Sequence, residues 1–192
     1  MEKMMKTPVD NRAQLVNCHI LVCYASSYGT TQEVAEYIGK LLRHKGAAID
    51  VKDIQTITQP ENYDAVFIGS AIQYDTWMPV ARNLVKNNAA FFKKIPVAYF
   101  FNCLTLAKRN EKTLAQANKY ADTVRAINPE IQPVSIGQFA GALKYSVLPI
   151  YFKLFFYILL KYVGLKEGDY RDWDAIKTWT NETIEKMALV KR

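Results

Sequence analysis

The feature that most constrains the fold of this chain lies within residues 20–35, where a short apolar segment runs directly into a loop of small hydroxyl residues and then into a helix. The first amides of such a helix have no partner within the helix and lie at the positive end of its dipole. The glycine of the loop can adopt positive φ or let a ligand approach the backbone closely. We therefore predict an α/β protein with an anion-binding loop. The loop residues are Ser26, Ser27, Gly29, Thr30 and Thr31.

The composition of this loop separates it from the commoner phosphate-binding loops. A single glycine rules out the G-x-G-x-x-G pattern of dinucleotide sites, and no G-K-[ST] sequence is present. Because the loop has no lysine, a nucleoside triphosphate with its magnesium ion is not expected. A monoester phosphate held by neutral donors fits the loop. The alternative is a serine-rich turn that begins a helix and binds nothing.

Three segments resemble the flavodoxin family. Residues 26–31 (Ser-Ser-Tyr-Gly-Thr-Thr) resemble the [ST]-x-T-G-x-T phosphate loop of flavodoxins, with Tyr28 where flavodoxins usually carry threonine. Residues 63–79 look like the third flavodoxin strand and the loop that carries a flavin-stacking aromatic residue. Residues 96–105 look like the fourth strand and the second flavin loop. The resemblance implies an FMN-binding α/β protein with a doubly wound, five-stranded parallel sheet in the order 2-1-3-4-5.

The C-terminal part is similar to a narrower group, the quinone-dependent protoporphyrinogen dehydrogenases built on a flavodoxin fold. The similarity rests on Phe139-Ala-Gly-Ala-Leu-Lys-Tyr, a long apolar segment and Tyr170-Arg-Asp-Trp-Asp-Ala-Ile, and in all it covers about residues 18–188. It implies an FMN-dependent oxidoreductase of heme biosynthesis that takes electrons from a porphyrinogen and passes them to a quinone. One alternative is an FMN electron-transfer protein that docks to a redox partner without its own substrate. Another is a binding protein that has lost the flavin.

The residue pattern predicts strands alternating with helices. Near-continuous apolar runs indicate strands that are covered on both faces, as in parallel sheets. Gly46 ends the first helix, Pro79 begins the next, and Asp172 caps the last. In such sheets ligands bind beyond the carboxyl ends of the strands, as FMN does in flavodoxin. The expected strands are 18–25, 48–53, 65–70, 96–101 and 132–139, and the expected helices are 31–45, 79–93, 111–126 and 173–188.

The loops after the first, third and fourth strands meet the three needs of FMN. Residues 26–31 would hold the phosphate, Trp77 and Tyr74 would offer aromatic faces to the flat ring, and backbone groups would serve its polar edge. Trp77 also fits a hydrophobic staple before a helix, and Cys103 fits a small buried residue. No side chain stands out as a general base, so no catalytic residue is assigned. The expected cofactor-binding residues are Ser26, Ser27, Tyr28, Gly29, Thr30, Thr31, Ser70, Ala71, Ile72, Gln73, Tyr74, Trp77, Asn102, Cys103 and Leu104.

A strongly apolar segment, residues 147–163, is expected to form an extra helix within an insertion at about 142–169. Its polar groups form one narrow stripe, whereas a helix on a sheet needs an apolar stripe of only somewhat over about 100°. The segment is shorter than the ~20 residues of a membrane span. Its apolar surface suits a peripheral membrane contact, a second copy of the chain in a homodimer, or an apolar substrate. The candidate partners for porphyrinogen carboxylates, chosen on charge and location, are Arg109, Lys144 and Lys153.

Length, charge and cysteine content set further limits. With 192 residues, half of them hydrophobic, the chain is expected to form one domain over 18–192 after a flexible leader over 1–17. Its net charge of +7 favours an anionic partner, and no arginine-rich arm or reader motif suggests nucleic acid. Three cysteines without C-x-x-C and only two histidines predict neither a disulfide framework nor a metal site. We expect a cytoplasmic protein, either free or peripheral on the inner face of the cell membrane.

Overall fold

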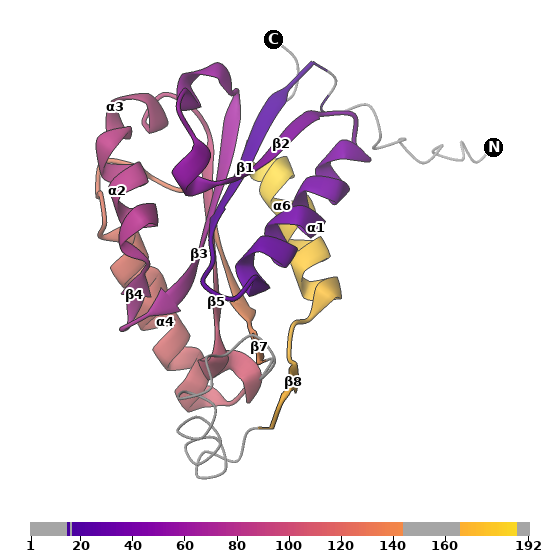
Figure 1. The fold of residues 1–192 in the computed structure, drawn as a ribbon, viewed down its shortest axis with the longest axis vertical. Helices are drawn as coiled ribbons and strands as arrows, with labels where there is room; N and C mark the ends of the chain where they lie inside the picture. The colour runs from indigo at the N-terminus through magenta and orange to yellow at the C-terminus, as the bar shows by residue number, and fades with distance from the viewer. Residues whose placement is uncertain (1–14, 16, 144–165, 188–192) are drawn as a thin grey trace, which may run out of the picture.

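The computed structural model describes residue 15, residues 17–143 and residues 166–187 (Figure 1). Most of the expected leader and the whole apolar segment 147–163 lie outside these residues, as do Lys144 and Lys153. The expectations for them therefore stay predictions.

Five parallel strands form the centre of the fold, in the order β2-β1-β3-β5-β6. Counted along the chain, this is the expected doubly wound order 2-1-3-4-5. Val22 of β1 lies between Val51 of β2 and Phe67 of β3. The strands are β1 (His19–Ala25), β2 (Ala48–Asp53), β3 (Ala65–Gln73), β5 (Val97–Cys103) and β6 (Ser135–Ala140).

Helices cover both faces of the sheet (Figure 1). α1 and α6 pack on one face, and α2, α3 and α4 pack on the other. Asp172 caps α6 as expected, since its Oδ1 accepts a hydrogen bond of 2.8 Å from the backbone N–H of Ala175. The helices are α1 (Thr30–Arg43), α2 (Pro79–Asn87), α3 (Ala89–Phe92), α4 (Glu111–Arg125) and α6 (Trp173–Met187).

Two elements differ from expectation, and one stretch for which no element was expected forms short turns. The single helix expected over 79–93 is divided at Asn88, whose φ of −112° lies outside the helical range. In the described stretch between β2 and β3 the chain forms only two 3₁₀ turns, η2 (Ile54–Thr56) and η3 (Pro60–Asn62). β6 begins at Ser135 rather than at residue 132, and Pro133, which has no backbone N–H to donate, precedes it.

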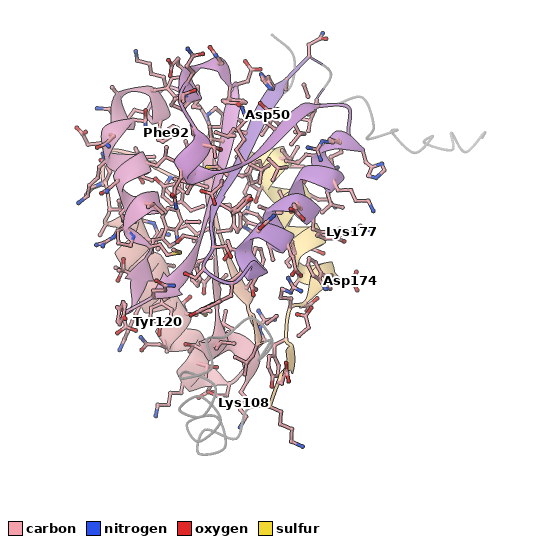
Figure 2. The ribbon with its side chains drawn as sticks, viewed as in Figure 1. Asp50, Phe92, Lys108, Tyr120, Asp174 and Lys177 are labelled. Atoms are coloured by element: carbon pink, nitrogen blue, oxygen red, sulfur yellow. The ribbon has the colours of Figure 1, made fainter. Side chains whose placement is uncertain are left out.

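Alternate residues of the strands point into two separate cores. From β1, Leu21 and Cys23 join the core under α2, α3 and α4, whereas Ile20 and Val22 join the core under α1 and α6. Side chains fill the space on both sides of the sheet (Figure 2). This burial on both faces explains why the strands read as continuous apolar runs rather than as alternating ones.

A second, two-stranded sheet flanks residues 144–165. β7 (Ala142–Leu143) pairs antiparallel with β8 (Gly168–Asp169) near the carboxyl end of β6 (Figure 1). The pairing places Leu143 next to Gly168. In the part of the chain that the structure describes, no helix combines the length and the apolar character of a membrane span.

Gly69 offers a direct test of the packing between β3 and β5. A Cβ atom at this position would lie 2.0 Å from Cζ of Phe100, which is fully buried in the neighbouring strand. We expect Gly69→Ala to lower the free energy of unfolding by about 1–3 kcal/mol, because neither ring nor backbone has room to move. Denaturant titration measures this change.

Gly168→Ala is the matched control for that measurement. A Cβ atom at Gly168 would meet its nearest neighbour at 3.9 Å, so the variant is expected to stay within about 0.5 kcal/mol of the wild-type protein. A Gly69→Ala protein as stable as this control would contradict the tight contact between the two strands.

Candidate functional site

The loop between β1 and α1 has the form expected of an anion-binding loop. Gly29 is the N-cap of α1 and adopts a φ of 81°, which is one of the two possibilities that its lack of a side chain allows. Among the described residues, no side chain caps this helix, and a Cβ atom at Gly29 would meet nothing within 4 Å. The first amides of a 14-residue helix therefore receive no side-chain cap at the positive end of its dipole.

Thr31 adds a buried hydroxyl to this loop. Thr31 is 0% exposed, and its Oγ1 has no hydrogen-bond partner in the described part of the chain. A buried hydroxyl that lacks a partner costs about 1–3 kcal/mol. Such a group in the first turn of α1 is chemically suited to donate to a bound anion.

Other residues of the loop contact neighbouring segments. Ser27 Oγ accepts a hydrogen bond of 2.7 Å from Gln73 Nε2 at the end of β3. Thr30 Oγ1 donates to the carbonyl of Ala142 in β7 at 3.5 Å. Tyr28, which stands where flavodoxins usually carry threonine, is 46% exposed. The side chains of Ser27 and Thr30 thus connect the loop to its surroundings.

The loop after β3 is a tight hairpin. Ile72 and Gln73 pair with Trp77 and Thr76 of the short strand β4 (Thr76–Trp77), and the two residues between them both have positive φ. Tyr74, with a φ of 51°, is 99% exposed. A left-handed conformation costs a residue with a Cβ atom roughly 1–2 kcal/mol. Strain of this kind often accompanies a functional role.

Trp77 differs from the expectation that its ring faces a flavin. The residue is 0% exposed, and its ring lies 4.9 Å from that of Tyr99 at an angle of 68°. Pairing of β4 with β3 places this side chain in the core under α2 and α4. In this position the indole has no surface to offer a ligand, so Tyr74 is the exposed aromatic residue of this loop.

The side chain of Ser70 also forms hydrogen bonds within the fold. Its buried hydroxyl donates to the carbonyl of Ala71 at 2.9 Å and accepts a hydrogen bond of 3.0 Å from the backbone N–H of Met78. The side chain therefore closes the hairpin at the start of α2. Any contact between this segment and a ligand falls to the backbone of the half-buried residues that follow, Ala71, Ile72 and Gln73.

The end of β5 supplies one further buried polar atom that has no partner among the described residues. Asn102 Nδ2 donates to the carbonyl of Ala140 at 3.1 Å, while Asn102 Oδ1 is buried without a hydrogen-bond partner in the described residues. Burial raises the pKa of the Cys103 thiol, which favours its neutral form. Leu104 begins the 3₁₀ helix η4 (Leu104–Ala107).

Strand register brings the three loops together. Ala25 at the end of β1 pairs with Ser70 of β3, and Ala71 of β3 pairs with Asn102 of β5. The loops at 26–31, 70–77 and 102–104 therefore leave the sheet side by side at one edge. This adjacency is the arrangement that their positions in the sequence predicted.

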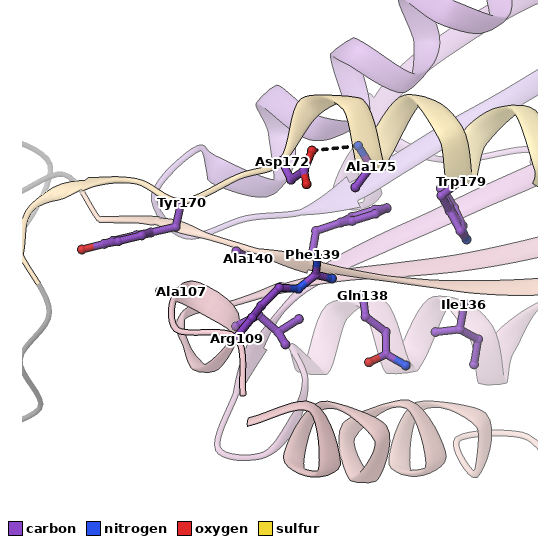
Figure 3. Close-up of a pocket in the computed structure, with 11 residues that line it drawn as sticks. Ala107, Arg109, Ile136, Gln138, Phe139, Ala140, Tyr170, Asp172, Ala175 and Trp179 are labelled. Atoms are coloured by element: carbon purple, nitrogen blue, oxygen red, sulfur yellow. Dashed lines mark hydrogen bonds between the residues drawn. The ribbon is translucent and has the colours of Figure 1, made fainter. Parts of the chain in front are cut away.

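A groove of about 560 Å³ lies next to this edge, along β6 (Figure 3). Arg109 is among its lining residues and reaches from the segment after η4 toward β6 (Figure 3). Phe139 and Trp179 contribute aromatic surface, with ring centres 5.4 Å apart. Residue types and spacing had not indicated this groove, because it forms only where β6, η4 and α6 meet. The lining residues are Leu106, Ala107, Arg109, Ile136, Gln138, Phe139, Ala140, Tyr170, Asp172, Ala175 and Trp179.

Sequence reasoning also missed Arg171. Its side chain is only 3% exposed, although arginine is seldom buried. The guanidinium contacts Asp169 of β8 and Glu33 of α1. Burial acts to lower the pKa of Arg171, and the hydrogen bonds that Arg171 donates to the carboxylates of Asp169 and Glu33 outweigh it, so that the pKa is raised and the charge is held.

Comparison with known proteins agrees with this geometry. The protoporphyrinogen IX dehydrogenase [quinone] of Escherichia coli (strain K12) is 30% identical over 169 residues, which cover 84% of this chain and 92% of that protein. The protein of the same name from Escherichia coli O157:H7 matches to the same extent. A solved flavodoxin from the domain Archaea shares the fold, with a TM-score of 0.50 and 16% identity over 88% of this chain and 98% of its own. The family model for the flavodoxin domain matches residues 21–163, and the chain therefore belongs to the flavodoxin domain family.

Proposed function

We propose that this protein is an FMN-dependent oxidoreductase that removes hydrogen from a porphyrinogen and passes the electrons to a quinone. The observation that carries the proposal is the uncapped first turn of α1 beside the buried hydroxyl of Thr31, which has no partner in the described residues. The name of the Escherichia coli relatives supports the choice of substrate and acceptor.

The residues present fit the phosphate of FMN. The amides that follow Gly29 and the Thr31 hydroxyl are neutral donors, and the loop carries no lysine. Neutral donors at a helix N-terminus suit a phosphate monoester. Ser26, Gly29 and Thr31 match the flavodoxin motif, and Thr30 Oγ1 donates a hydrogen bond to the carbonyl of Ala142.

The residues present also fit the ring of FMN. Tyr74 offers an exposed aromatic face, and Asn102 Oδ1 offers a buried acceptor on the opposite loop. When bound, FMN supplies the electron transfer, and the chain positions the ring and adjusts its surroundings. The proposed cofactor-binding backbone runs from Ser70 to Gln73 and from Asn102 to Leu104.

We propose that the groove along β6 receives the substrate. η4 follows directly after Cys103, so the wall of the groove continues from the loop assigned to the flavin. Arg109 is a partner for a carboxylate, and Phe139 and Tyr170 offer apolar faces. Lys144 and Lys153 remain proposed further partners, as do a membrane contact through 147–163 and a homodimer.

A second candidate function is electron transfer by bound FMN to a redox partner protein, without a separate substrate. The nearly complete exposure of Tyr74 favours it, because a ring stacked there would lie close to a docking protein. Catalysis separates the two candidates, since only the first oxidises a porphyrinogen.

The visible absorption spectrum of the purified protein, followed by titration with FMN, is the first test. We expect flavin bands or tight uptake of FMN. Protein that shows neither would refute an FMN-dependent function of either kind.

Gly29→Ala tests the phosphate loop. The new Cβ atom meets no neighbour, so the change acts through the positive φ of 81° and through the access of the phosphate to the backbone. We expect FMN affinity to fall about tenfold or more, measured by fluorescence titration. Gly46→Ala carries a similar backbone cost at a φ of 93° after the other end of α1 and should keep its affinity. Equal affinities of the two variants would remove Gly29 from the site.

Tyr74→Asn separates stability from binding. Asparagine tolerates positive φ, so the free energy of unfolding should rise by up to about 1 kcal/mol. FMN affinity should nevertheless fall about two- to tenfold because the stacking face is lost. Tyr74→Phe keeps the ring and should bind as the wild-type protein does. An unchanged dissociation constant for Tyr74→Asn would show that the ring does not contact the flavin.

Arg109→Ala tests the proposed substrate groove. With protoporphyrinogen and a quinone as substrates, the wild-type protein should catalyse oxidation of the porphyrinogen. The variant should have a KM for protoporphyrinogen about tenfold higher, because a charge-assisted hydrogen bond is lost. Lys112→Ala, an exposed change of the same charge in α4, is the control. A wild-type protein that binds FMN but oxidises no porphyrinogen would favour the electron-transfer alternative.

A further inference from the structure

We propose that Arg171 sets the charge and position of the phosphate loop, so that it determines the preference of this protein for FMN over riboflavin, which lacks the phosphate. This inference rests on the proposed function, because it concerns the same site. Arg171 contacts Glu33 and the Thr30 carbonyl and is proposed to act through the first turn of α1. It is therefore a positioning residue.

The contacts of Arg171 join two segments that are distant in sequence, residues 30–33 and residues 169–171. Its Nη2 lies 2.7 Å from Glu33 Oε2 in α1 and 2.6 Å from Asp169 Oδ2 in β8, and its Nε donates to Asp169 Oδ1 at 2.8 Å. Its Nη1 donates to the carbonyl of Thr30 at 3.5 Å. The guanidinium thus contacts the backbone of the phosphate loop itself.

Aromatic packing keeps the guanidinium in this orientation. Its central carbon lies 4.5 Å from the ring centre of Trp173, and that ring meets Tyr37 of α1 edge-on at 5.0 Å. Arginine suits this place because a planar fork can bind a carboxylate through two nitrogens and stack on a ring at once. Arg171 is the one charged residue that is buried among those the structure describes.

The charges explain why a buried cation is placed here. Glu33 lies in the first turn of α1, one turn after Gly29, whose carbonyl accepts a hydrogen bond of 2.9 Å from the Glu33 amide. A carboxylate there suits the helix dipole but repels a phosphate bound at the same helix end. Arg171 supplies a positive charge beside Glu33 and Asp169, and removing it would make the surroundings of the loop more negative by one unit.

The test compares FMN with riboflavin on the full-length protein freed of flavin, by fluorescence titration at low and at high salt. We expect Arg171→Met to reduce the ratio of FMN to riboflavin affinity about tenfold at low salt, with a smaller effect at high salt. Arg171→Lys keeps the charge but loses the planar fork, so its ratio should lie between that of Arg171→Met and the wild-type value. Glu33→Gln should raise the ratio, and the double variant Glu33→Gln with Arg171→Met should restore it.

One control variant and one fallback measurement support the interpretation of these results. Glu130→Gln removes an exposed carboxylate that pairs with Lys93, and it should leave the ratio unchanged. If Arg171→Met fails to fold, the Glu33→Gln variant still tests whether the charge beside the loop sets the ratio of FMN to riboflavin affinity, because that ratio is expected to rise. A ratio unchanged in both variants would overturn the inference while leaving FMN binding intact. Wild-type protein that binds neither flavin would overturn the proposed function instead.

Discussion

Burial of a parallel sheet on both faces is the constraint on which the rest of this structure depends. Strands that must be covered twice require crossover connections, and these return every strand in the same direction. All carboxyl ends then meet at one edge, where Ala25, Ala71 and Asn102 become neighbours across β1, β3 and β5. The fold therefore gathers three loops that are widely separated along the chain, and the candidate site follows from the way the core is closed.

At this edge of the sheet, some polar groups form hydrogen bonds that stabilise the fold. Others have no hydrogen-bond partner among the described residues. The Ser70 hydroxyl closes the hairpin before α2, and Trp77 fills the core beside Tyr99. Thr31 Oγ1 and Asn102 Oδ1 are buried without partners among the described residues. Since buried polar atoms without partners are costly, these two atoms, which follow β1 and lie at the end of β5, are the physical reason to expect a ligand at this edge.

Charge links this edge to the segment that flanks residues 144–165. Arg171 joins Glu33 and the Thr30 carbonyl to Asp169, and Thr30 Oγ1 reaches Ala142 in β7. The side chains of Arg171 and Thr30 thus connect the loop at 26–31 to the β7–β8 pair. The groove with Arg109 lies along the adjacent strand, and in the proposed function the same edge of the sheet holds cofactor and substrate.

How much of the structure can be predicted from the sequence depends on the sequence separation of the residues that interact. The hydroxyl-rich loop, the positive φ at Gly29, the doubly wound sheet and the Asp172 cap follow from local patterns, because apolar runs, glycine conformation and capping depend on near neighbours. Trp77 and Tyr74 could not be distinguished in this way, since only the pairing of β4 with β3 turns one ring inward and leaves the other exposed. Arg171 and the groove along β6 depend on contacts between distant segments. Sequence thus determined the fold and the place of the candidate site, whereas tertiary structure decided which side chains are exposed or buried there, because burial and charge pairing are settled only when remote segments pack.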